Sequence, residues 1–162
     1  MQTLQVLDRI DLKILSALQA EARISNQKLA DKVALSASSC LQRVKKLEKS
    51  GLLKSYHAYL DIEKIQRHVS CIATVRLLNH SQKHILQFEN LIAAIDEIVE
   101  CFTVSGQFDF FLRIICPDMS HYLAINDHLI SSCQQGIAIN THVIMKTNKV
   151  FRGIKLDTIL PQ

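Results

Sequence analysis

Residues 29–53 read LADKVALSASSCLQRVKKLEKSGLL, and two short helical patterns follow one another closely in this stretch. The first begins at Asn26 and ends where Leu35 and Ser36 form a turn. Ser36 can cap the second helix, because a serine at this position accepts a hydrogen bond from the first helical turn. Gly51 can end that helix as the residue beyond its C-cap. Two helices joined by so short a turn predict a helix-turn-helix.

An amphipathic helix is expected before this pair. Asp8 can cap it, and Asp11 adds negative charge to its first turn. The apolar positions that recur at helical spacing are Leu7, Ile10, Ile14, Leu15 and Leu18. Residues 1–53 are therefore expected to form a three-helix domain with a helix-turn-helix layout.

The last of the three helices has two chemically different faces when its residues are placed at about 100° per residue. Its expected buried face holds Cys40, Leu41, Val44 and Leu47. The polar face and the cap supply the candidate DNA-binding residues Ser36, Ser38, Ser39, Gln42, Arg43, Lys45, Lys46 and Lys49. Arg43 suits guanine edges and Gln42 adenine edges, whereas the serines and lysines suit phosphates. The alternative is a plain helical bundle with a solvated basic face.

Charge is divided unevenly along the chain. Residues 1–60 hold ten Lys and Arg against five Asp and Glu, whereas residues 61–162 hold nine against ten. This division predicts a polyanion contact confined to the N-terminal part, with double-stranded DNA as the expected partner. Charge alone does not distinguish DNA from an acidic protein, so an adaptor that binds a protein partner remains a second hypothesis.

The remaining residues alternate between strand and helix patterns. The expected elements are a strand at 69–77, a helix capped by Ser81, strands at 98–105 and 108–116 joined at Gly106 and Gln107, a helix capped by Asp118 and ended by Gly136, and a strand at 137–145. The apolar stripes of the two helices are Ile85, Phe88, Ile92 and Ile95, and Tyr122, Ile125, Leu129, Ile130 and Cys133. This βαββαβ order predicts a ferredoxin-like domain and an α+β fold for the whole chain.

The predicted boundaries are 1–53 for the helix-turn-helix domain, 54–68 for a wing or hinge, 69–147 for the ferredoxin-like domain and 148–162 for a C-terminal tail. Helices on one side of a four-stranded sheet leave its other face open. The alternate positions expected there are Ile72, Phe102 or Cys101, Phe111, Ile115 and Ile144. A largely apolar open face predicts that another copy of the chain covers it, which makes the protein at least a dimer.

The usual local signatures of enzymes are missing. The four glycines do not form a phosphate-binding loop, and the chain has no G-x-S-x-G, H-E-x-x-H or Walker sequence, so neither catalysis nor a cofactor is expected. His80 and His84 have a spacing that can share a metal, but no third ligand stands nearby, so no metal site is expected. An RNA-binding role would need exposed aromatic residues on a sheet face that is expected to be covered.

The five cysteines are widely spaced and form no C-x-x-C pair. Each is expected to be a buried small hydrophobic residue, with a redox switch at an exposed thiol as the alternative. The start of the chain lacks the features of a secretory signal, and no apolar run approaches the length of a membrane span. A cytoplasmic protein is expected.

Three segments together resemble the Lrp/AsnC family of leucine-responsive and asparagine-responsive bacterial transcriptional regulators. They are LDRIDLKILSALQAEARIS at 7–25, the run at 29–53, and VSGQFDFFLRIICPDMSHY at 104–122. The resemblance extends along nearly the whole chain. It implies a winged or simple helix-turn-helix, a hinge, and a C-terminal domain that binds a small effector and pairs through its sheets. Dimers, and often tetramers or octamers, are implied, and enzyme activity is not.

The resemblance also implies that an amino acid binds in a crevice between subunits, beside the hairpin turn. Asp109 is the best candidate, because its carboxylate can accept hydrogen bonds from an α-ammonium group. The implied ligand-binding residues are Thr103, Gly106, Gln107, Phe108, Asp109, Met119 and His142. The alternative for Asp109 is a turn residue that bonds its own backbone.

The chain departs from the family pattern at four positions. Ala37 and Ser39 stand where relatives often have prolines, which predicts a less rigid entry to the recognition helix. Gln107 occupies a position that is frequently acidic and His142 one that is frequently aromatic, so these departures leave the effector's identity open.

Overall fold

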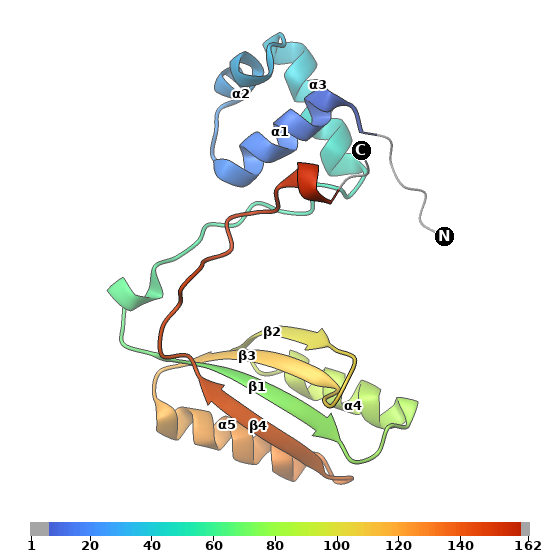
Figure 1. The fold of residues 1–162 in the computed structure, drawn as a ribbon, viewed down its shortest axis with the longest axis vertical. Coiled ribbons are helices and arrows are strands. Elements are labelled where there is room, and N and C mark those ends of the chain that lie inside the picture. The colour runs from blue at the N-terminus through green and yellow to red at the C-terminus, as the bar shows by residue number, and fades with distance from the viewer. Residues whose placement is uncertain (1–6, 160–162) are drawn as a thin grey trace. The chain divides into compact units, whose positions relative to one another are not determined.

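The computed structural model describes residues 7–159 and divides the chain into two compact units. The helical unit consists of residues 7–59 together with residues 149–159, and the sheet unit consists of residues 60–148. The chain therefore passes from one unit to the other twice, as the two connecting segments in Figure 1 show. Within the described residues, no helix is long and apolar enough to cross a membrane.

The helical unit contains α1 (Arg9–Ala20), α2 (Asn26–Val33) and α3 (Ala37–Lys49). The caps predicted at Asp8 and Ser36 are present, whereas the side chain of Ser81, at the start of the first helix of the sheet unit, makes no capping hydrogen bond. Asp8 accepts hydrogen bonds from the backbone N–H groups of Ile10 and Asp11, and the Asp11 carboxylate accepts one from the Asp8 N–H, which completes a capping box. Ser25 caps α2 by accepting from the Lys28 N–H, and Ser36 caps α3 by accepting from the Ser39 N–H. These three helices confirm the helix-turn-helix layout.

A short turn connects α2 to α3. Ala34 has a left-handed backbone, with φ of 57°, and the Leu35 N–H donates to the carbonyl of Ala30. The side-chain amide of Asn26 donates to the carbonyl of Ala37 at 2.8 Å, which ties the start of α2 to the start of α3. These contacts fix the angle at which α3 leaves the turn.

Eight residues form the buried core of the helical unit, namely Ile14, Leu15, Leu18, Leu29, Ala30, Val33, Cys40 and Leu47. The prediction that Leu41 also lies on the buried face was wrong, because it is 43% exposed. Leu41 follows the fully buried Cys40, and successive residues on a helix are about 100° apart, which places Leu41 at the edge of the packed face.

Residues 149–159 pack against the helical unit. The Ile154 N–H donates to Oε1 of Gln19 at 2.7 Å, and Nε2 of Gln19 donates to the Ile154 carbonyl at 3.1 Å. Leu156, in a short 3-10 helix (Leu156–Thr158), packs against the core of the unit. The segment that was predicted as a separate tail is thus, over its described residues, a part of the helical unit.

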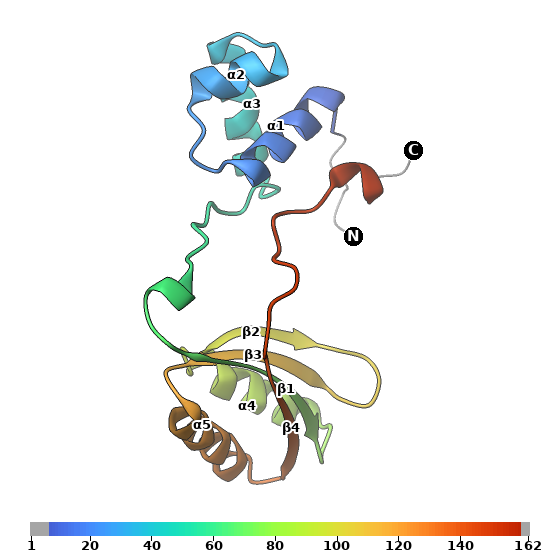
Figure 2. The ribbon, with the colours of Figure 1, turned by 60° about the vertical axis from the view of Figure 1, so that its left-hand side comes forward.

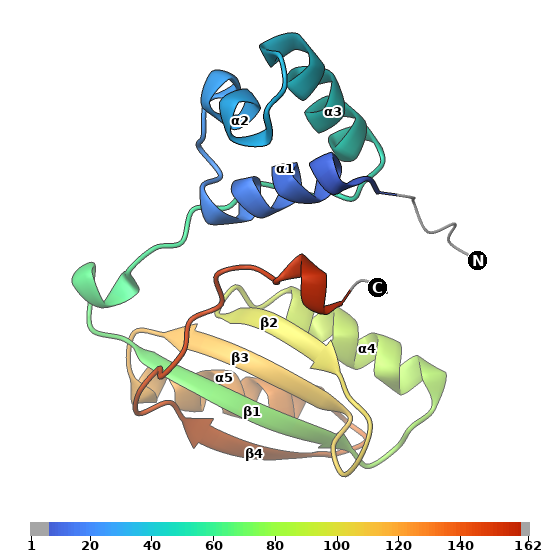
Figure 3. The same cartoon turned by 45° about the horizontal axis from the view of Figure 1, so that its top comes forward.

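The sheet unit contains β1 (Val69–Leu77), α4 (Gln82–Ala93), β2 (Ile98–Thr103), β3 (Phe110–Cys116), α5 (Met119–Ser132) and β4 (Ile137–Val143). The strands form one sheet in the order β2-β3-β1-β4, and every neighbouring pair is antiparallel. Both helices cover the same face of the sheet (Figures 2 and 3). This arrangement confirms the ferredoxin-like prediction.

Alternate strand residues bury the face beneath the helices. Ala73 of β1 pairs with Leu112 of β3, and both are fully buried. The rings of Phe88 on α4 and Phe110 on β3 lie with their centroids 4.8 Å apart. Helix α5 adds Tyr122, Ile125 and Leu129 to this core.

Two details of α5 differ from prediction. Ile130 is 48% exposed rather than buried, because it follows the buried Leu129 by about 100° around the helix. The helix ends at Ser132, four residues before Gly136, so Gly136 does not end it. Gly136 instead has φ of 79° in the turn before β4, where an added Cβ would lie 2.8 Å from the Leu78 side chain.

The face of the sheet away from the helices is called the open face here. The register places Phe102 on it, opposite Phe111, whereas Cys101 lies on the helix side, opposite Leu112. Ile72, Phe111, Ile115 and Ile144 are half-buried on this face. It also carries Arg76, Arg113, Asn140 and His142, by their pairing with open-face residues, so it is less apolar than predicted. The alternation of the strands predicted which apolar residues lie on this face, but the prediction did not include the charged and polar residues that lie there too.

Candidate functional site

The exposed face of α3 is the first candidate surface. Seven of its eight predicted DNA-binding residues are exposed, namely Ser36, Ser38, Ser39, Gln42, Lys45, Lys46 and Lys49. The Ser36 hydroxyl accepts from the Ser39 N–H at 3.2 Å, lies 2.8 Å from the Ser39 hydroxyl and lies 3.1 Å from the Ser38 hydroxyl. Hydroxyl groups and the positive end of the helix dipole therefore stand together at the start of α3, with lysines along the rest of the helix.

Arg43 is the exception on this face. Its Nη1 atom lies 2.7 Å from Oδ2 of Asp8 and 2.7 Å from Oδ1 of Asp11, and the side chain is half-buried. The Asp11 backbone N–H and the Arg43 guanidinium hold the pKa of Asp8 below its usual range. Arg43 thus ties α3 to the start of α1. The predicted contact of Arg43 with guanine stays a prediction, and it would require the guanidinium to leave these two carboxylates.

The segment after α3 was predicted to be an extended wing or linker. Residues 52–60 form neither a helix nor a strand. The Tyr56 hydroxyl donates to Oε1 of Glu48 on α3 at 2.9 Å. Partial burial and the neighbouring Glu48 carboxylate raise the pKa of Tyr56 to about 12. This hydrogen bond fastens the start of the linker to α3.

The second candidate surface is a cleft of about 600 Å³ at the β2–β3 turn, called the turn pocket here. Four residues predicted for the ligand site line it, namely Gly106, Gln107, Phe108 and Asp109. Arg76, His80, Ala138, Ile139 and Asn140 complete its lining. The pocket therefore combines a turn with the ends of β1 and β4, and its charged lining residues include one of each sign, Arg76 and Asp109.

Asp109 is held in place by neighbours on both sides. Its Oδ2 accepts from the Leu77 N–H at 2.7 Å, and its own N–H donates to the carbonyl of Val75 at 2.9 Å. Nε2 of His80 lies 3.0 Å from Oδ1. The carboxylate therefore bonds the backbone of the adjacent strand rather than only its own turn. His80 occupies part of the space in which a cationic group of a ligand would meet the carboxylate.

Sequence reasoning missed Arg76, His80 and Asn140. The alternation of β1 was a usable signal, because Val75 and Leu77 are buried and Arg76 between them must therefore lie on the open face. His80 and Asn140 come from other parts of the chain than the turn. Only the strand pairing brings them beside it.

Three predicted ligand residues do not line the turn pocket. Thr103 pairs with Phe110 and shares the helix side of the sheet with it. His142 lies on the open face two residues beyond Asn140. Met119 begins α5 and follows the far end of β3. Their role in ligand binding stays a prediction. It requires that another copy of the chain bring these residues to the pocket.

The described histidines form no metal cluster, and two of the five cysteines are not buried. The His80 ring is within hydrogen-bonding distance of the Asp109 carboxylate, and the His84 ring is within hydrogen-bonding distance of the Ser81 hydroxyl. Residues 7–159 contain no cluster of three or more metal-ligating side chains. The prediction that every cysteine is buried was wrong, because Cys101 is exposed on the edge strand β2 and Cys133 is only half-buried. Burial raises the pKa of the Cys40, Cys71, Cys116 and Cys133 thiols, and partial desolvation together with the Glu89 carboxylate raises the pKa of Cys101, which disfavours the reactive thiolate form.

A helix-turn-helix with a basic exposed helix, joined to a separate ferredoxin-like unit with a charged pocket, defines a DNA-binding regulator with a ligand-binding domain. Residues 7–54 match the family model described as winged helix-turn-helix DNA-binding, and residues 70–154 match the Lrp/AsnC ligand binding domain. The chain belongs to the Lrp/AsnC family of transcriptional regulators.

Similar proteins agree with this assignment. The chain is 41% identical over 118 residues to the leucine-responsive regulatory protein of Haemophilus influenzae, covering 73% of this chain and 71% of that protein. It is 34% identical over 152 residues to the protein of the same name in Escherichia coli (strain K12), covering 94% and 93%. The structure of the transcriptional regulator NMB0573/L-Met complex from Neisseria meningitidis superimposes with a TM-score of 0.88 at 29% identity, covering 96% of this chain and 100% of that one. These relatives are regulators of transcription.

Proposed function

We propose that this chain controls transcription in the bacterial cytoplasm by binding double-stranded DNA through α3 and an amino acid in the turn pocket. The effector acts by changing the oligomeric state of the protein or the arrangement of its DNA-binding units. The protein needs no cofactor and catalyses no reaction in this role. The carrying observation is the pairing of an exposed, lysine-rich α3 in one unit with a pocket holding both Arg76 and Asp109 in the other.

The DNA contact follows from the shape and charge of α3. An α-helix fits the major groove, and the polar residues along its exposed face can contact both base edges and phosphates. Gln42 supplies an amide for base edges, while Lys46 and Lys49 supply charges for phosphates. Two copies of the helical unit would occupy successive major grooves about 34 Å apart on a palindromic site.

The effector class follows from the charges of the turn pocket. An amino acid carries an ammonium and a carboxylate group close together, and Asp109 and Arg76 supply the complementary charges in one cleft. The pocket is of the size that holds small metabolites. The L-Met complex of the Neisseria meningitidis regulator supports an amino acid as the effector.

Assembly follows from the open face. Ile72, Phe111 and Ile115 give this face an apolar centre that a second copy of the chain would cover, which supports a dimer and, through further contacts, a tetramer or octamer. Residues outside a single pocket, such as Met119, would reach an effector only across such an interface. An effector shifts the assembly only if it binds one arrangement more tightly than the other.

Selection of genomic DNA with the purified protein, followed by mobility shifts with a panel of amino acids, tests the proposal. A shared palindromic site whose binding changes with one amino acid is expected. Failure to enrich any DNA at low salt would instead favour the adaptor hypothesis. Asp109→Asn keeps an acceptor for the Leu77 N–H but lacks the charge, so it should bind DNA and lose the amino-acid response.

Lysine variants locate the DNA surface on the helical unit. Lys46→Ala and Lys49→Ala should weaken binding to all sequences and reduce the salt slope by about one each, whereas the exposed Lys13 of α1 serves as a matched control. Arg43→Ala separates two roles. A base contact predicts that affinity falls only for the selected site, whereas a purely structural role predicts that Arg43→Ala and Asp8→Asn both weaken binding to all sequences.

A further inference from the structure

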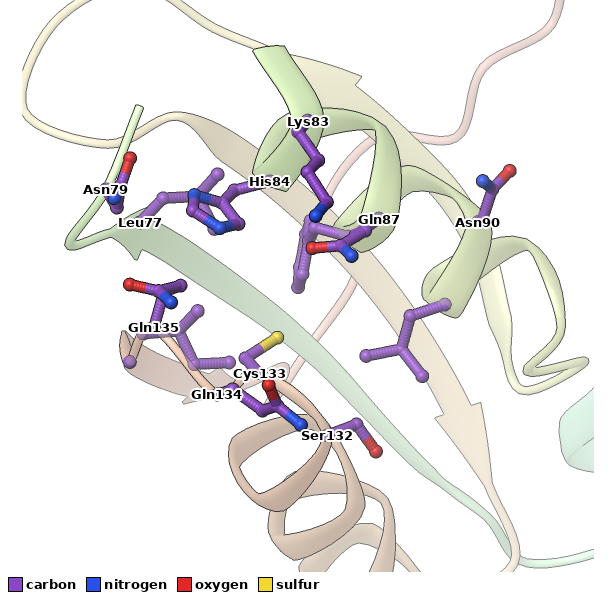
Figure 4. A pocket seen from close by; sticks show the side chains of 14 residues that line it. Leu77, Asn79, Lys83, His84, Gln87, Asn90, Ser132, Cys133, Gln134 and Gln135 are labelled. Atoms are coloured by element: carbon purple, nitrogen blue, oxygen red, sulfur yellow. The ribbon is translucent and has the colours of Figure 1, made fainter. Parts of the chain in front are cut away.

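A second cleft lies on the helix side of the sheet unit, between α4 and the connection from α5 to β4. It has a volume of about 500 Å³ and is called the helix cleft here. None of its lining residues lines the turn pocket. In Figure 4, Lys83, His84 and Gln87 on α4 face Cys133, Gln134 and Gln135 across it. Its size falls within the range of pockets that bind small molecules.

The chemistry of the helix cleft is one-sided. Its lining contains one lysine and one histidine but no aspartate or glutamate. Within residues 7–159, no carboxylate lies within salt-bridge distance of Lys83. Nδ1 of His84 lies 2.8 Å from the Ser81 hydroxyl, which orients the ring and leaves Nε2 for another partner. A carboxylate is therefore the group that this cleft can bind by charge.

The rest of the lining defines the remainder of the ligand. Side-chain amides surround the cleft and can donate to a carbonyl or hydroxyl oxygen. They come from Asn79, Gln87, Asn90, Gln134 and Gln135. The apolar part of the lining is formed by the half-buried Leu91 and Ile137, with the buried Leu77 and Phe88 behind them, which suits a short hydrocarbon chain. The fitting molecule carries a carboxylate, a neutral oxygen and a small apolar group.

The two clefts differ in whether their lining includes a carboxylate. The turn pocket contains Asp109, which can meet an ammonium group, whereas the helix cleft offers an ammonium no carboxylate. We propose that the helix cleft is a second ligand site, selective for small aliphatic carboxylic acids without an ammonium group, such as 2-oxo acids. Its ligand class goes beyond the amino acid proposed for the turn pocket and does not depend on it.

The sites share one wall. Arg76 and His80 line the turn pocket, whereas Leu77 and Asn79 line the helix cleft. The Leu77 N–H donates to the Asp109 carboxylate, so the segment 76–80 contacts both sites. A ligand in the helix cleft would therefore contact the segment that orients Asp109.

Calorimetric titration of the full chain with 4-methyl-2-oxopentanoate and with L-leucine tests the proposal, because the two probes differ only in the oxo or ammonium group. Lys83→Gln should weaken 4-methyl-2-oxopentanoate binding by about tenfold or more, the effect of losing a charged hydrogen bond. Lys64→Gln, which changes an exposed lysine elsewhere in the sheet unit, should leave it unchanged. Unchanged thermal unfolding of Lys83→Gln shows that the fold is kept.

Asp109→Asn distinguishes the two sites. It should weaken L-leucine or another amino acid and leave 4-methyl-2-oxopentanoate unaffected. The proposal is overturned if the oxo acid does not bind at millimolar concentration, if Lys83→Gln leaves its affinity unchanged, or if Lys83→Gln weakens L-leucine equally. If the wild-type protein binds 4-methyl-2-oxopentanoate but responds to no amino acid, the proposed effector is refuted and the helix cleft still stands.

Discussion

The docking of residues 149–159 on the helical unit depends on the backbone at Gly153, and Gly153→Ala tests this dependence. Gly153 has φ of 104°, in the left-handed region that side chains other than hydrogen rarely adopt. An added Cβ would lie 2.7 Å from Oε1 of Gln19 and 3.1 Å from its Cβ and Cδ atoms. The same Oε1 accepts the Ile154 N–H, so the substitution should displace Gln19 and break both of its hydrogen bonds to Ile154.

The expected loss follows from these contacts. A non-glycine residue in this backbone region costs about 1 to 3 kcal/mol. Each lost hydrogen bond adds about 0.5 to 1 kcal/mol. The sum of about 2 to 5 kcal/mol corresponds to a drop of about 30-fold to several thousandfold in the docking equilibrium. Gln19→Ala removes the hydrogen bonds without the backbone strain, so its effect should be smaller.

Hydrogen exchange at the Ile154 amide measures this docking directly, because that N–H is the donor to Gln19. Exchange should accelerate strongly in Gly153→Ala and less in Gln19→Ala. Gly106→Ala is the matched control, since Gly106 has φ of 116° with no atom within 4 Å of an added Cβ and lies in the sheet unit. If Ile154 exchanges at the wild-type rate in Gly153→Ala, the reasoning is refuted.

Three further predictions concern the cores and the titrating groups. Leu129→Ala should lower the free energy of unfolding by about 2 to 5 kcal/mol in denaturant titrations, whereas the exposed Ile130→Ala should change it by less than about 0.5 kcal/mol. Because the pKa of Asp8 is lowered by folding, its contribution to stability is present above its ordinary value of 3.8 and is lost as pH falls through the lowered value. Asp8→Asn should remove that part of the acid transition followed by circular dichroism, and an unchanged transition would contradict the assignment. Glu48→Gln should bring the pKa of Tyr56 down from about 12 in an ultraviolet titration, and a value that stays there would assign the shift to burial alone.

The element order was predictable because its signals are local. A capping side chain and an apolar spacing lie within a few residues of each other, so Asp8, Ser36 and Asp118 marked helix starts that the structure confirms. The four residues of the turn pocket that come from the β2–β3 turn were also found because they are contiguous. Local information was therefore sufficient for the fold and for four of the nine residues that line the turn pocket.

The parts that were missed depend on contacts between distant residues. The ion pairs of Arg43 join residues 35 and 32 positions apart, and the hydrogen bonds of Gln19 with Ile154 span 135 positions. A helical wheel shows which residues share a face but not how far the packing partner covers that face. Leu41 and Ile130 were therefore predicted to be buried, although both are exposed. Such features require the packing partner to be known.

The helical unit is discontinuous, and this has a consequence for synthesis. The ribosome makes α1, α2 and α3 first, then the whole sheet unit at 60–148, and only afterwards the segment that carries Gly153 and Leu156. The ligand-binding unit therefore has all its residues before the DNA-binding unit has received its last segment. A product that stops after residue 148 would keep every lining residue of the turn pocket and of the helix cleft while leaving Gln19 without its partner. A protein in which the DNA-binding unit is complete therefore always contains the whole ligand-binding unit.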